Sequence, residues 1–250
     1  MAKSYLEVRM NIHIYNSKTQ IDQAVAKLLI EQVNEKPNSV LGLATGSTPV
    51  GIYQLLTKDH SKNQTDYHAV KTVNLDEYIG LPKTHTESYY NFMNRHLFSQ
   101  INIDQKNTYI PDGLCSNQQA ACDEYNEILD KYVPDIQILG IGTNGHIGFN
   151  EPNTSFLSKT HIIELAEKTR KDNARFFDSI DEVPTHAITM GIQNIMNAKK
   201  IILVATGKQK ASAVKAMISG PIHEGLPASV LQQHPNVEIF LDKEAALLLL

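Results

Sequence analysis

Strand-length apolar runs that alternate with amphipathic helical segments constrain the fold of this chain more than any other feature of its sequence. The runs occupy residues 39–45, 70–77, 135–142, 199–207 and 236–242. They are continuous rather than alternating, as expected for strands that are buried on both faces. Between them, apolar residues recur every three or four positions, for example over residues 21–29 and 89–97. This alternation predicts an α/β fold with a doubly wound, mainly parallel sheet and helices on both faces.

We expect a single domain over residues 1–250, because the sequence contains no internal repeat, low-complexity segment or linker rich in Pro, Gly or Ser. With 42% hydrophobic residues, a chain of this length buries a substantial core. The least regular stretch carries Pro152, Asn153 and Pro184. Irregular segments of this kind often cover active sites, so we predict a mobile lid around residues 155–187.

The charge distribution argues against nucleic-acid and membrane partners. The 23 basic and 27 acidic residues give a formal net charge of −4 and are spread along the chain without a basic stripe. The C-terminal apolar run, residues 247–250, is far too short to span a bilayer, and we predict a cytoplasmic protein. Cys115 and Cys122 lie seven residues apart in a predicted helix, too far apart for a disulfide, so both are expected to be free thiols.

Four strand ends carry polar residues, and ligands of such sheets bind at the carboxyl ends of the strands. After Thr45, the residues Gly46, Ser47 and Thr48 form a short turn, and Pro49 is expected at the first helical position. Such a turn directs free backbone N–H groups and two hydroxyls toward one point beside the helix dipole, which suits a single phosphate monoester. It lacks the lysine and the spacing of a nucleoside-triphosphate loop. An ordinary N-capped helix is the alternative interpretation.

The second apolar run ends in two carboxylates, Asp76 and Glu77. Burying a carboxylate without a partner is costly, and successive side chains of a strand point in opposite directions. At most one of the two is therefore expected to enter a site. A solvated turn would also explain the pair. Together with the other strand ends, Asp76 is a candidate general base.

The third strand end contains Gly140, Gly142 and Gly145, which formally match the glycine pattern of a dinucleotide-binding loop. That interpretation requires a helix to begin there, so that the pyrophosphate meets its N-terminus. The sequence instead continues with Gly, Asn and Pro residues that oppose a helix, which argues against a dinucleotide site. His146 and Glu151 are better candidates, since an imidazole positioned by a carboxylate moves protons near neutral pH.

The fourth strand end places Lys208 and Lys210 at the start of a helix. The helix dipole favours cations at the other end, so two lysines here suggest an anionic ligand, with a solvated basic turn as the alternative. Arg175, in the predicted lid, is a candidate for a further bidentate phosphate contact.

These stretches together resemble one enzyme family. The motifs LATGSTP, NLDEYIGLP, ESYYNFM, GIGTNGHIGFNEP, ARFFD and GKQKA occur in the order and at the approximate spacing of glucosamine-6-phosphate deaminases, over residues 38–242. The resemblance implies conversion of glucosamine 6-phosphate and water to fructose 6-phosphate and ammonia, without an organic cofactor or a catalytic metal. It also implies a single Rossmann-like domain with a lid.

The resemblance assigns roles to individual positions. His146 matches the histidine that opens the pyranose ring, and Glu151 matches the acid that assists it. Asp76 matches the base that removes the C2 proton and delivers a proton to C1, so no hydride acceptor is needed. The residues that match the phosphate-anchoring group are Thr45, Gly46, Ser47, Thr48, Arg175 and Lys210.

Two departures limit what the resemblance implies. Asn144 stands where many members have an aspartate of the catalytic set, and an amide orients the imidazole ring but cannot stabilise an imidazolium by charge. We therefore predict that Glu151 carries more of this task. Allosterically regulated hexameric members carry basic residues where this chain has His161 and Ile163. We thus expect no such activation, and a monomer rather than a hexamer.

Two other functions are compatible with the same scaffold. A 6-phosphogluconolactonase-like hydrolase has no C2 proton to abstract, so Asp76 would have no comparable duty. A non-catalytic sugar-phosphate sensor should carry a DNA-binding helix-turn-helix before the sheet. The roughly 38 residues that precede the first predicted strand contain no basic recognition helix.

Overall fold

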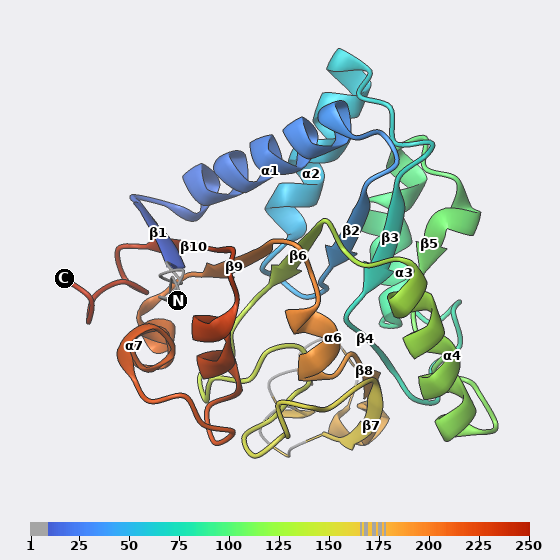
Figure 1. The fold of residues 1–250 in the computed structure, drawn as a ribbon. Helices are drawn as coiled ribbons and strands as arrows, with labels where there is room; N and C mark the ends of the chain where they lie inside the picture. Colours follow the sequence, from blue (N-terminus) through green and yellow to red (C-terminus); the bar gives the residue numbers. More distant parts are fainter. Residues whose placement is uncertain (1–9, 166, 168–169, 172–173, 175–176, 178) are drawn as a thin grey trace, which may run out of the picture.

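The centre of the molecule is a seven-stranded sheet in the order β1-β10-β9-β6-β2-β3-β5 (Figure 1). The computed structural model describes residues 10–165, 167, 170–171, 174, 177 and 179–250. The strands of this sheet are β1 (Met10–Tyr15), β2 (Val40–Leu43), β3 (Lys71–Asn74), β5 (Thr108–Tyr109), β6 (Ile136–Leu139), β9 (Ile201–Ala205) and β10 (Val237–Asp242). Every pair is parallel, which confirms the predicted fold class.

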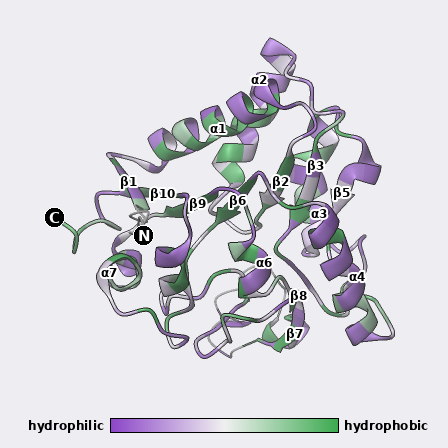
Figure 2. Cartoon of the chain, in the orientation of Figure 1, coloured by the Kyte–Doolittle hydropathy of each residue, from purple (hydrophilic) through white to green (hydrophobic). Residues whose placement is uncertain are grey.

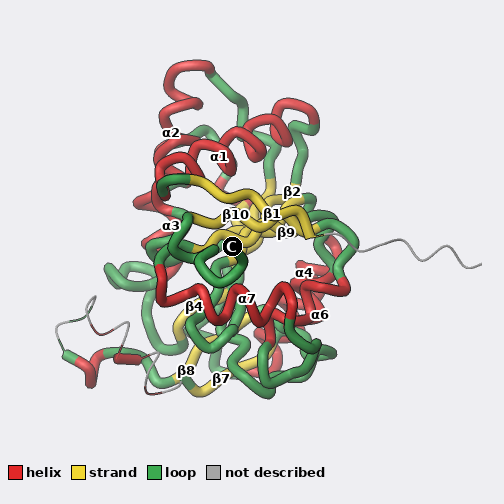
Figure 3. The backbone as a smooth tube through the Cα atoms, turned by 90° about the vertical axis from the view of Figure 1, so that its left-hand side faces the viewer, coloured by secondary structure: helices red, strands yellow, loops and turns green. Residues whose placement is uncertain are grey.

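Helices pack against both faces of this sheet (Figures 1 and 3). One face is covered by α1 (Lys18–Glu35), α2 (Val50–Asn63) and α3 (Tyr89–His96), and the other by α4 (Gln118–Lys131), α6 (Ile192–Met196) and α7 (Ala211–Ser219). Short 3-10 turns complete the described structure: η1 (Phe98–Gln100), η2 (Gln105–Asn107), η4 (Ile180–Glu182), η5 (Lys208–Lys210) and η6 (Pro227–Gln233). Among the described residues, no helix combines the length and apolar character needed to cross a membrane.

The sequence of β9 explains why its apolar run is continuous. Ile201, Leu203 and Ala205 pack into the hydrophobic core on one face of the sheet, whereas Ile202 and Val204 pack into the core on the other. A central strand has no solvent-facing side, so no polar residue interrupts it. The helices are amphipathic and turn their hydrophobic residues toward the sheet (Figure 2).

Side-chain caps fix the starts of three helices. Ser17, Ser88 and Asn117 each have extended backbone, and each accepts a hydrogen bond from the backbone N–H three residues later. These bonds satisfy one of the N–H groups that a helix start leaves without an intrahelical partner.

A second, three-stranded antiparallel sheet was not predicted. It consists of β4 (Asp76–Tyr78), β8 (His186–Thr189) and β7 (His161–Glu164), in that order. The apolar run 70–77 is therefore not one strand, because β3 ends at Asn74 and β4 begins at Asp76. In consequence Asp76 belongs to the small sheet and pairs with Thr189.

Other predictions of the local structure also need correction. The first strand was expected at residue 39, but β1 precedes it and pairs with β10. Cys115 was expected in a helix and instead precedes α4, while Cys122 lies within it, and both are free thiols as predicted.

The predicted lid, residues 155–187, contains β7 and η4 and extends into β8. Arg170 in this segment donates hydrogen bonds to the carbonyl oxygens of Ile180 (3.0 Å) and Val183 (3.1 Å). Residues 166, 168–169, 172–173, 175–176 and 178 lie outside the described residues. Movement of this segment stays a prediction.

The order of the strands fixes where a ligand binds. From β2 the chain proceeds through β3 to β5 at one edge, and from β6 through β9 to β10 toward the other. The neighbours β2 and β6 thus form a topological switch point, where the connections after the two strands diverge and leave a crevice.

Candidate active site

A cavity at this switch point, here called the main cavity, brings together residues that are distant in the sequence. Its lining includes the predicted site residues Thr45, Gly46, Thr48, Asp76 and His146. The remaining lining residues are Ala44, Leu75, Tyr89, Gly140, Ile141, Gly142, Gly148 and Phe149. These residues come from four parts of the chain: the turn after β2, the start of β4, the start of α3 and the loop after β6.

The turn after β2 has the features expected of an anion-binding turn. Gly46 adopts φ +81°, a left-handed conformation that a side chain would strain. Pro49 is the N-cap and α2 begins at Val50, one residue later than predicted. The backbone N–H groups of residues 46–48 donate no hydrogen bond to any other residue that the structure describes. They lie at the N-terminus of a 14-residue helix, where the dipole favours an anion.

The main cavity receives Asp76 and not Glu77, as the alternation of strand side chains requires. Asp76 is 6% exposed. Burial raises the pKa of the Asp76 carboxyl to about 8, and the negative charge of Glu77 adds to the rise. A carboxyl whose pKa lies near neutral pH is suited to take up and return a proton during a reaction.

Glu77 instead joins β4 to α3. Its carboxylate accepts hydrogen bonds from the backbone N–H groups of Tyr78 (2.8 Å), Tyr89 (2.9 Å) and Tyr90 (2.9 Å). Burial raises the pKa of the Glu77 carboxyl to about 6, and these three bonds oppose the rise because they favour the ionised form. Glu77 thus fixes the start of α3, which carries Tyr89 into the main cavity.

The loop after β6 is a tight turn and contains no helix. The N–H of Gly142 donates to the carbonyl of His146 (2.9 Å), and Gly145 adopts φ +84°. A side chain at position 142 would place its Cβ 2.5 Å from the imidazole ring of His146, so the glycine there makes room for the histidine. The glycines therefore shape a turn beside the cavity, and the loop does not present a helix N-terminus to a pyrophosphate.

The end of this loop is held against the small sheet. The side-chain amide of Asn150 donates to the carbonyl oxygens of Ile147 (2.9 Å) and Met190 (2.8 Å). The backbone N–H of Phe149 donates to the hydroxyl of Thr189 (3.3 Å), the residue that pairs with Asp76. These bonds hold the loop that carries His146 beside the strand that carries Asp76, and both residues line the main cavity.

His146, Glu151 and Asn144 form a connected set. The Nδ1 atom of His146 lies 3.5 Å from Oε1 of Glu151. The other carboxylate oxygen of Glu151 accepts a hydrogen bond from the side-chain amide of Asn144 (2.7 Å). Asn144 was expected to orient the imidazole ring, but its amide instead binds Glu151, and its Oδ1 accepts from the backbone N–H of His146 (3.3 Å). Asn144 therefore orients the carboxylate, and the carboxylate faces the ring.

The other predicted phosphate-binding residues do not belong to the described lining of the main cavity. Ser47 is exposed and lines a neighbouring cavity rather than the main one. Lys210 is the N-cap of α7 and is half-buried, but it is not part of the described lining of the main cavity. Lys208 is exposed. Arg175 lies outside the described residues, so its contribution stays a prediction.

Aromatic residues beside the site were not predicted as functional. Tyr89, interpreted from the sequence as a helix core position, lines the main cavity. Its ring lies nearly parallel to Phe149 at 6.2 Å and packs against Tyr78 at 4.7 Å, both measured between centroids. Its hydroxyl forms side-chain hydrogen bonds with Thr45 and Tyr78. The only sequence signal was its place in the ESYYNFM motif, which helical periodicity alone cannot distinguish from a core position.

The described residues contain no group of three or more His, Cys, Asp or Glu side chains arranged to hold a metal ion. The cavity instead offers a buried carboxyl, an imidazole backed by a carboxylate, and free amide groups at a helix start. Such a set can bind an anion and move protons between nearby atoms of one small molecule.

Comparisons with known proteins agree on one family. The family model described as glucosamine-6-phosphate isomerases/6-phosphogluconolactonase matches residues 16–240. A curated glucosamine-6-phosphate deaminase from Halalkalibacterium halodurans is 52% identical over 221 residues, which cover 88% of this chain and 90% of the relative. A solved structure described as a monomeric glucosamine-6-phosphate deaminase superposes with a TM-score of 0.93 at 44% identity, covering 96% of this chain and 100% of that one.

The fold extends to more distant enzymes. A 6-phosphogluconolactonase from Trypanosoma brucei superposes with a TM-score of 0.79, covering 97% of this chain and 100% of that one, but shares only 20% identity. Similarity at this level establishes a common fold and carries no argument about the reaction.

Proposed function

This chain belongs to the glucosamine-6-phosphate isomerase/6-phosphogluconolactonase family, and we infer that within this family it is a glucosamine-6-phosphate deaminase. The observation that carries the inference is its 52% identity, over nearly its whole length, to a curated deaminase. The enzyme converts glucosamine 6-phosphate and water to fructose 6-phosphate and ammonia. This reaction combines deamination with an aldose–ketose isomerisation and belongs to amino sugar metabolism.

We propose that the phosphate of the substrate binds at the turn after β2. The free N–H groups of residues 46–48 and the hydroxyls of Ser47 and Thr48 lie at the positive end of α2. Arg175 and Lys210 would add cations to this site. The phosphate is bonded to C6 and the reaction takes place at C1 and C2, so the energy of phosphate binding can position the sugar against Asp76 and His146.

Ring opening is the first step of the proposed mechanism. The hemiacetal of the pyranose opens when the O1 hydroxyl loses its proton and the ring oxygen O5 gains one. His146 can carry this proton, because its Nδ1 faces the Glu151 carboxylate and leaves Nε2 as the nitrogen available to the substrate. The carboxylate stabilises the positive charge that the ring acquires while it holds the proton.

Asp76 carries out the isomerisation in the proposed mechanism. Its carboxylate removes the proton from C2 of the open aldose, and the electrons of the C–H bond form the C1–C2 double bond of an enolamine. The π electrons of the C1 carbonyl move to O1, which takes up a proton that the ammonium group at C2 releases. The same carboxyl then delivers a proton to C1, which leaves an imine at C2. Water adds to this imine and ammonia leaves, giving the C2 ketone of fructose 6-phosphate. No electrons leave the substrate, so the route needs no redox cofactor.

The direct test uses purified, metal-stripped protein and glucosamine 6-phosphate. We expect ammonia and fructose 6-phosphate to appear in equal amounts, because each turnover releases one of each. A parallel assay with 6-phosphogluconolactone tests the hydrolase alternative. Lactone hydrolysis without ammonia release would replace the deaminase assignment.

We further propose that the enzyme acts as a cytoplasmic monomer without allosteric activation. The solved relative at 44% identity is described as monomeric. On β7, His161 and Ile163 occupy the positions at which regulated hexamers carry basic residues, and His161 Nδ1 is hydrogen-bonded to the carbonyl of Lys159 (2.8 Å). A cytoplasmic location suits a phosphorylated substrate, whose charge keeps it within the compartment where it forms.

This proposal predicts a hyperbolic rate curve that N-acetylglucosamine 6-phosphate leaves unshifted, apart from competition at high concentration. The reason is that a neutral Ile163 offers no charge to a second phosphate. Light scattering at assay concentration is expected to give the mass of one 27.9 kDa chain. A sigmoidal curve that N-acetylglucosamine 6-phosphate abolishes would contradict the prediction.

A further inference from the structure

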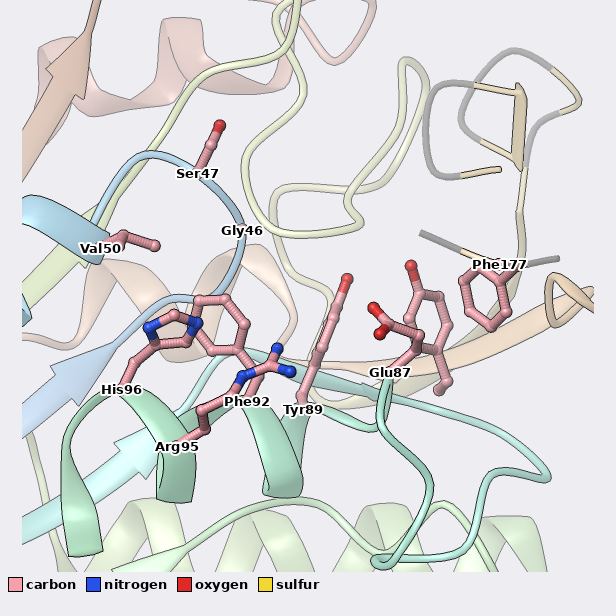
Figure 4. A pocket seen from close by; sticks show the side chains of 10 residues that line it. Gly46, Ser47, Val50, Glu87, Tyr89, Phe92, Arg95, His96 and Phe177 are labelled. Atoms are coloured by element: carbon pink, nitrogen blue, oxygen red, sulfur yellow. The ribbon is translucent and has the colours of Figure 1, made fainter. Parts of the chain in front are cut away.

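A second cavity, here called the side cavity, adjoins the main cavity and shares Gly46 and Tyr89 with it. Figure 4 shows the turn that contains Gly46 and Ser47 on one side of the side cavity, α3 beneath it, and Phe177 at its far end. Most of its described walls are apolar or aromatic, but a carboxylate, a guanidinium and an imidazole also line it, from Glu87, Arg95 and His96. The sequence motifs assign no role to any of these three.

Arg95 lines the side cavity together with Gly46 and Ser47 of the turn after β2. It lies in the last turn of α3, and its guanidinium extends from the helix into the side cavity below Gly46 (Figure 4). Within the described part of the chain the guanidinium forms no ion pair or hydrogen bond, whereas the backbone carbonyl of Arg95 accepts one from the side chain of Gln100 (2.6 Å). The guanidinium therefore keeps its donors available for a ligand.

His96 contributes little charge beside it. Burial and the positive charge of Arg95 lower the pKa of the His96 imidazole, which therefore stays neutral near neutral pH. Its ring packs against Phe92 with centroids 4.4 Å apart. Among the described lining residues, Arg95 is thus the one that is positively charged near neutral pH, in a protein whose net charge is −4.

The turn above Arg95 needs a cation to complete an anion site. Residues 46–48 offer N–H groups and hydroxyls but no charged side chain. A phosphate monoester carries close to two negative charges at neutral pH, and guanidinium groups bind its oxygens in a bidentate manner. Gly46 and Ser47 of the turn and Arg95 line the same cavity, so amide donors and a guanidinium are both available to an anion bound there.

We propose that Arg95 binds the phosphate group of the substrate from the side cavity, opposite the amide groups of residues 46–48. The proposal rests on the proposed function, which makes a phosphate monoester the ligand. It adds Arg95 to the phosphate-binding residues that the sequence motifs indicate. Glu87 lines the same cavity, on the side of Phe177 (Figure 4), and its carboxylate opposes the binding of an anion.

The test compares three substitutions that each remove one charge. Arg95→Gln and Glu87→Gln change opposite charges in the side cavity. Lys58→Gln is the matched control, because Lys58 is an exposed cation of α2 that lines a groove beside α1, apart from both cavities. For each variant we would measure kcat and KM for glucosamine 6-phosphate at low and high ionic strength, the calorimetric Kd of inorganic phosphate, and Tm.

Arg95→Gln is expected to raise KM and the phosphate Kd about ten-fold at low salt, with kcat changed by less than about two-fold, because the lost contact binds ground and transition states alike. The difference shrinks at high salt, since the site is open to solvent. Glu87→Gln is expected to lower both constants, and Lys58→Gln to leave them unchanged.

Three results would overturn the proposal. The first is an Arg95→Gln variant with normal KM and phosphate Kd. The second is an equal effect of Lys58→Gln, which would indicate a general loss of positive charge. The third is a lower Tm and kcat with an unchanged phosphate Kd, which would leave Arg95 only the role of stabilising the end of α3. If the wild-type protein binds phosphate but releases no ammonia, the deaminase assignment fails while the calorimetry still decides the role of Arg95.

Discussion

Asp76→Asn is expected to lower deaminase turnover by about a thousand-fold or more while leaving phosphate binding intact. Removal of the C2 proton requires a carboxylate at this position, and an amide of the same shape cannot accept the proton. The proposed phosphate contacts lie on the turn after β2 and do not involve Asp76. The variant should therefore lose kcat far more than substrate affinity.

The same substitution is expected to stabilise the folded protein at pH 8. The pKa of the Asp76 carboxyl is raised to about 8 in the folded state, whereas an unfolded aspartate titrates near its model value of 3.8. Below pH 3.8 both states are protonated and the buried carboxyl carries no ionisation penalty. As pH rises toward 8, the unfolded state ionises first, so the free energy of unfolding falls across this window. Asparagine removes that fall, by an amount on the order of 2 kcal/mol, or several degrees in Tm.

Thermal unfolding of wild type and Asp76→Asn at pH 5 and pH 8, beside the turnover assay, checks both parts. The gap in Tm should widen from pH 5 to pH 8. Asp130→Asn, an exposed substitution on α4, serves as the control and should show neither the pH-dependent gap nor a loss of turnover. Persistent turnover in Asp76→Asn would refute the assigned role, and a Tm gap independent of pH would refute the raised pKa.

The loss of activity and the gain in stability have one cause. A carboxyl buried beside Glu77 at the start of β4 is costly to ionise, and in the proposed mechanism the same burial gives the reaction a base of suitable strength. Glu77 illustrates the opposite arrangement, in which three backbone N–H groups surround the buried carboxylate. Two adjacent acids in the sequence thus serve different purposes, one in the chemistry and one in fixing α3.

Periodicity predicts the buried strands well and the edge strands poorly. The run at 199–207 became β9 because a strand with helices on both faces must be apolar at every position. β1 was missed because it lies at the sheet edge, where polar Asn11 and His13 are tolerated and form contacts with Glu238. β5 has only two residues, too few for any periodic signal. The antiparallel sheet was not predicted because β4 pairs with a segment more than 100 residues away along the chain, and because β7 and β8 lie in the irregular stretch that was interpreted as a lid.

The sequence indicated Asp76, His146 and the turn after β2 because glycines and ionisable residues after apolar runs are unusual. It indicated Asp76 rather than Glu77 as the base, but only the structure shows which face of the three-residue strand β4 meets the cavity. It also missed Tyr89 and Arg95, which lie on a helix whose pattern resembles that of any amphipathic helix. Their contribution depends on how Glu77 and Ser88 fix the start of α3.

Glu151→Gln is expected to lower kcat about 100-fold, and Asn144→Ala only about ten-fold. The Glu151 carboxylate lies 3.5 Å from Nδ1 of His146, where its charge can balance a positive charge on the imidazole ring. Glutamine keeps the shape of the side chain but loses this charge. Asn144 affects the imidazole ring only through Glu151, because its side-chain amide donates to Glu151 rather than to the imidazole. Its removal should therefore cost less activity.

The direction of that hydrogen bond explains how an asparagine can occupy this position. The Asn144 amide N–H donates to the Glu151 carboxylate at 2.7 Å, whereas an aspartate at the same distance would place two carboxylates in contact, and like charges repel. Asn144 therefore orients the Glu151 carboxylate without adding a second negative charge beside the histidine. Removing Asn144 frees the Glu151 side chain to adopt other rotamers but leaves its charge in place.

Steady-state kinetics of both single variants and of the double variant, with Tm as a check on folding, measure this order. Because Asn144 acts through Glu151, the double variant should be no slower than Glu151→Gln alone, and the two effects should not multiply. Multiplying effects would mean that Asn144 contacts the substrate independently. An Asn144→Ala variant slower than Glu151→Gln would contradict the assignment of the charge-stabilising role to Glu151.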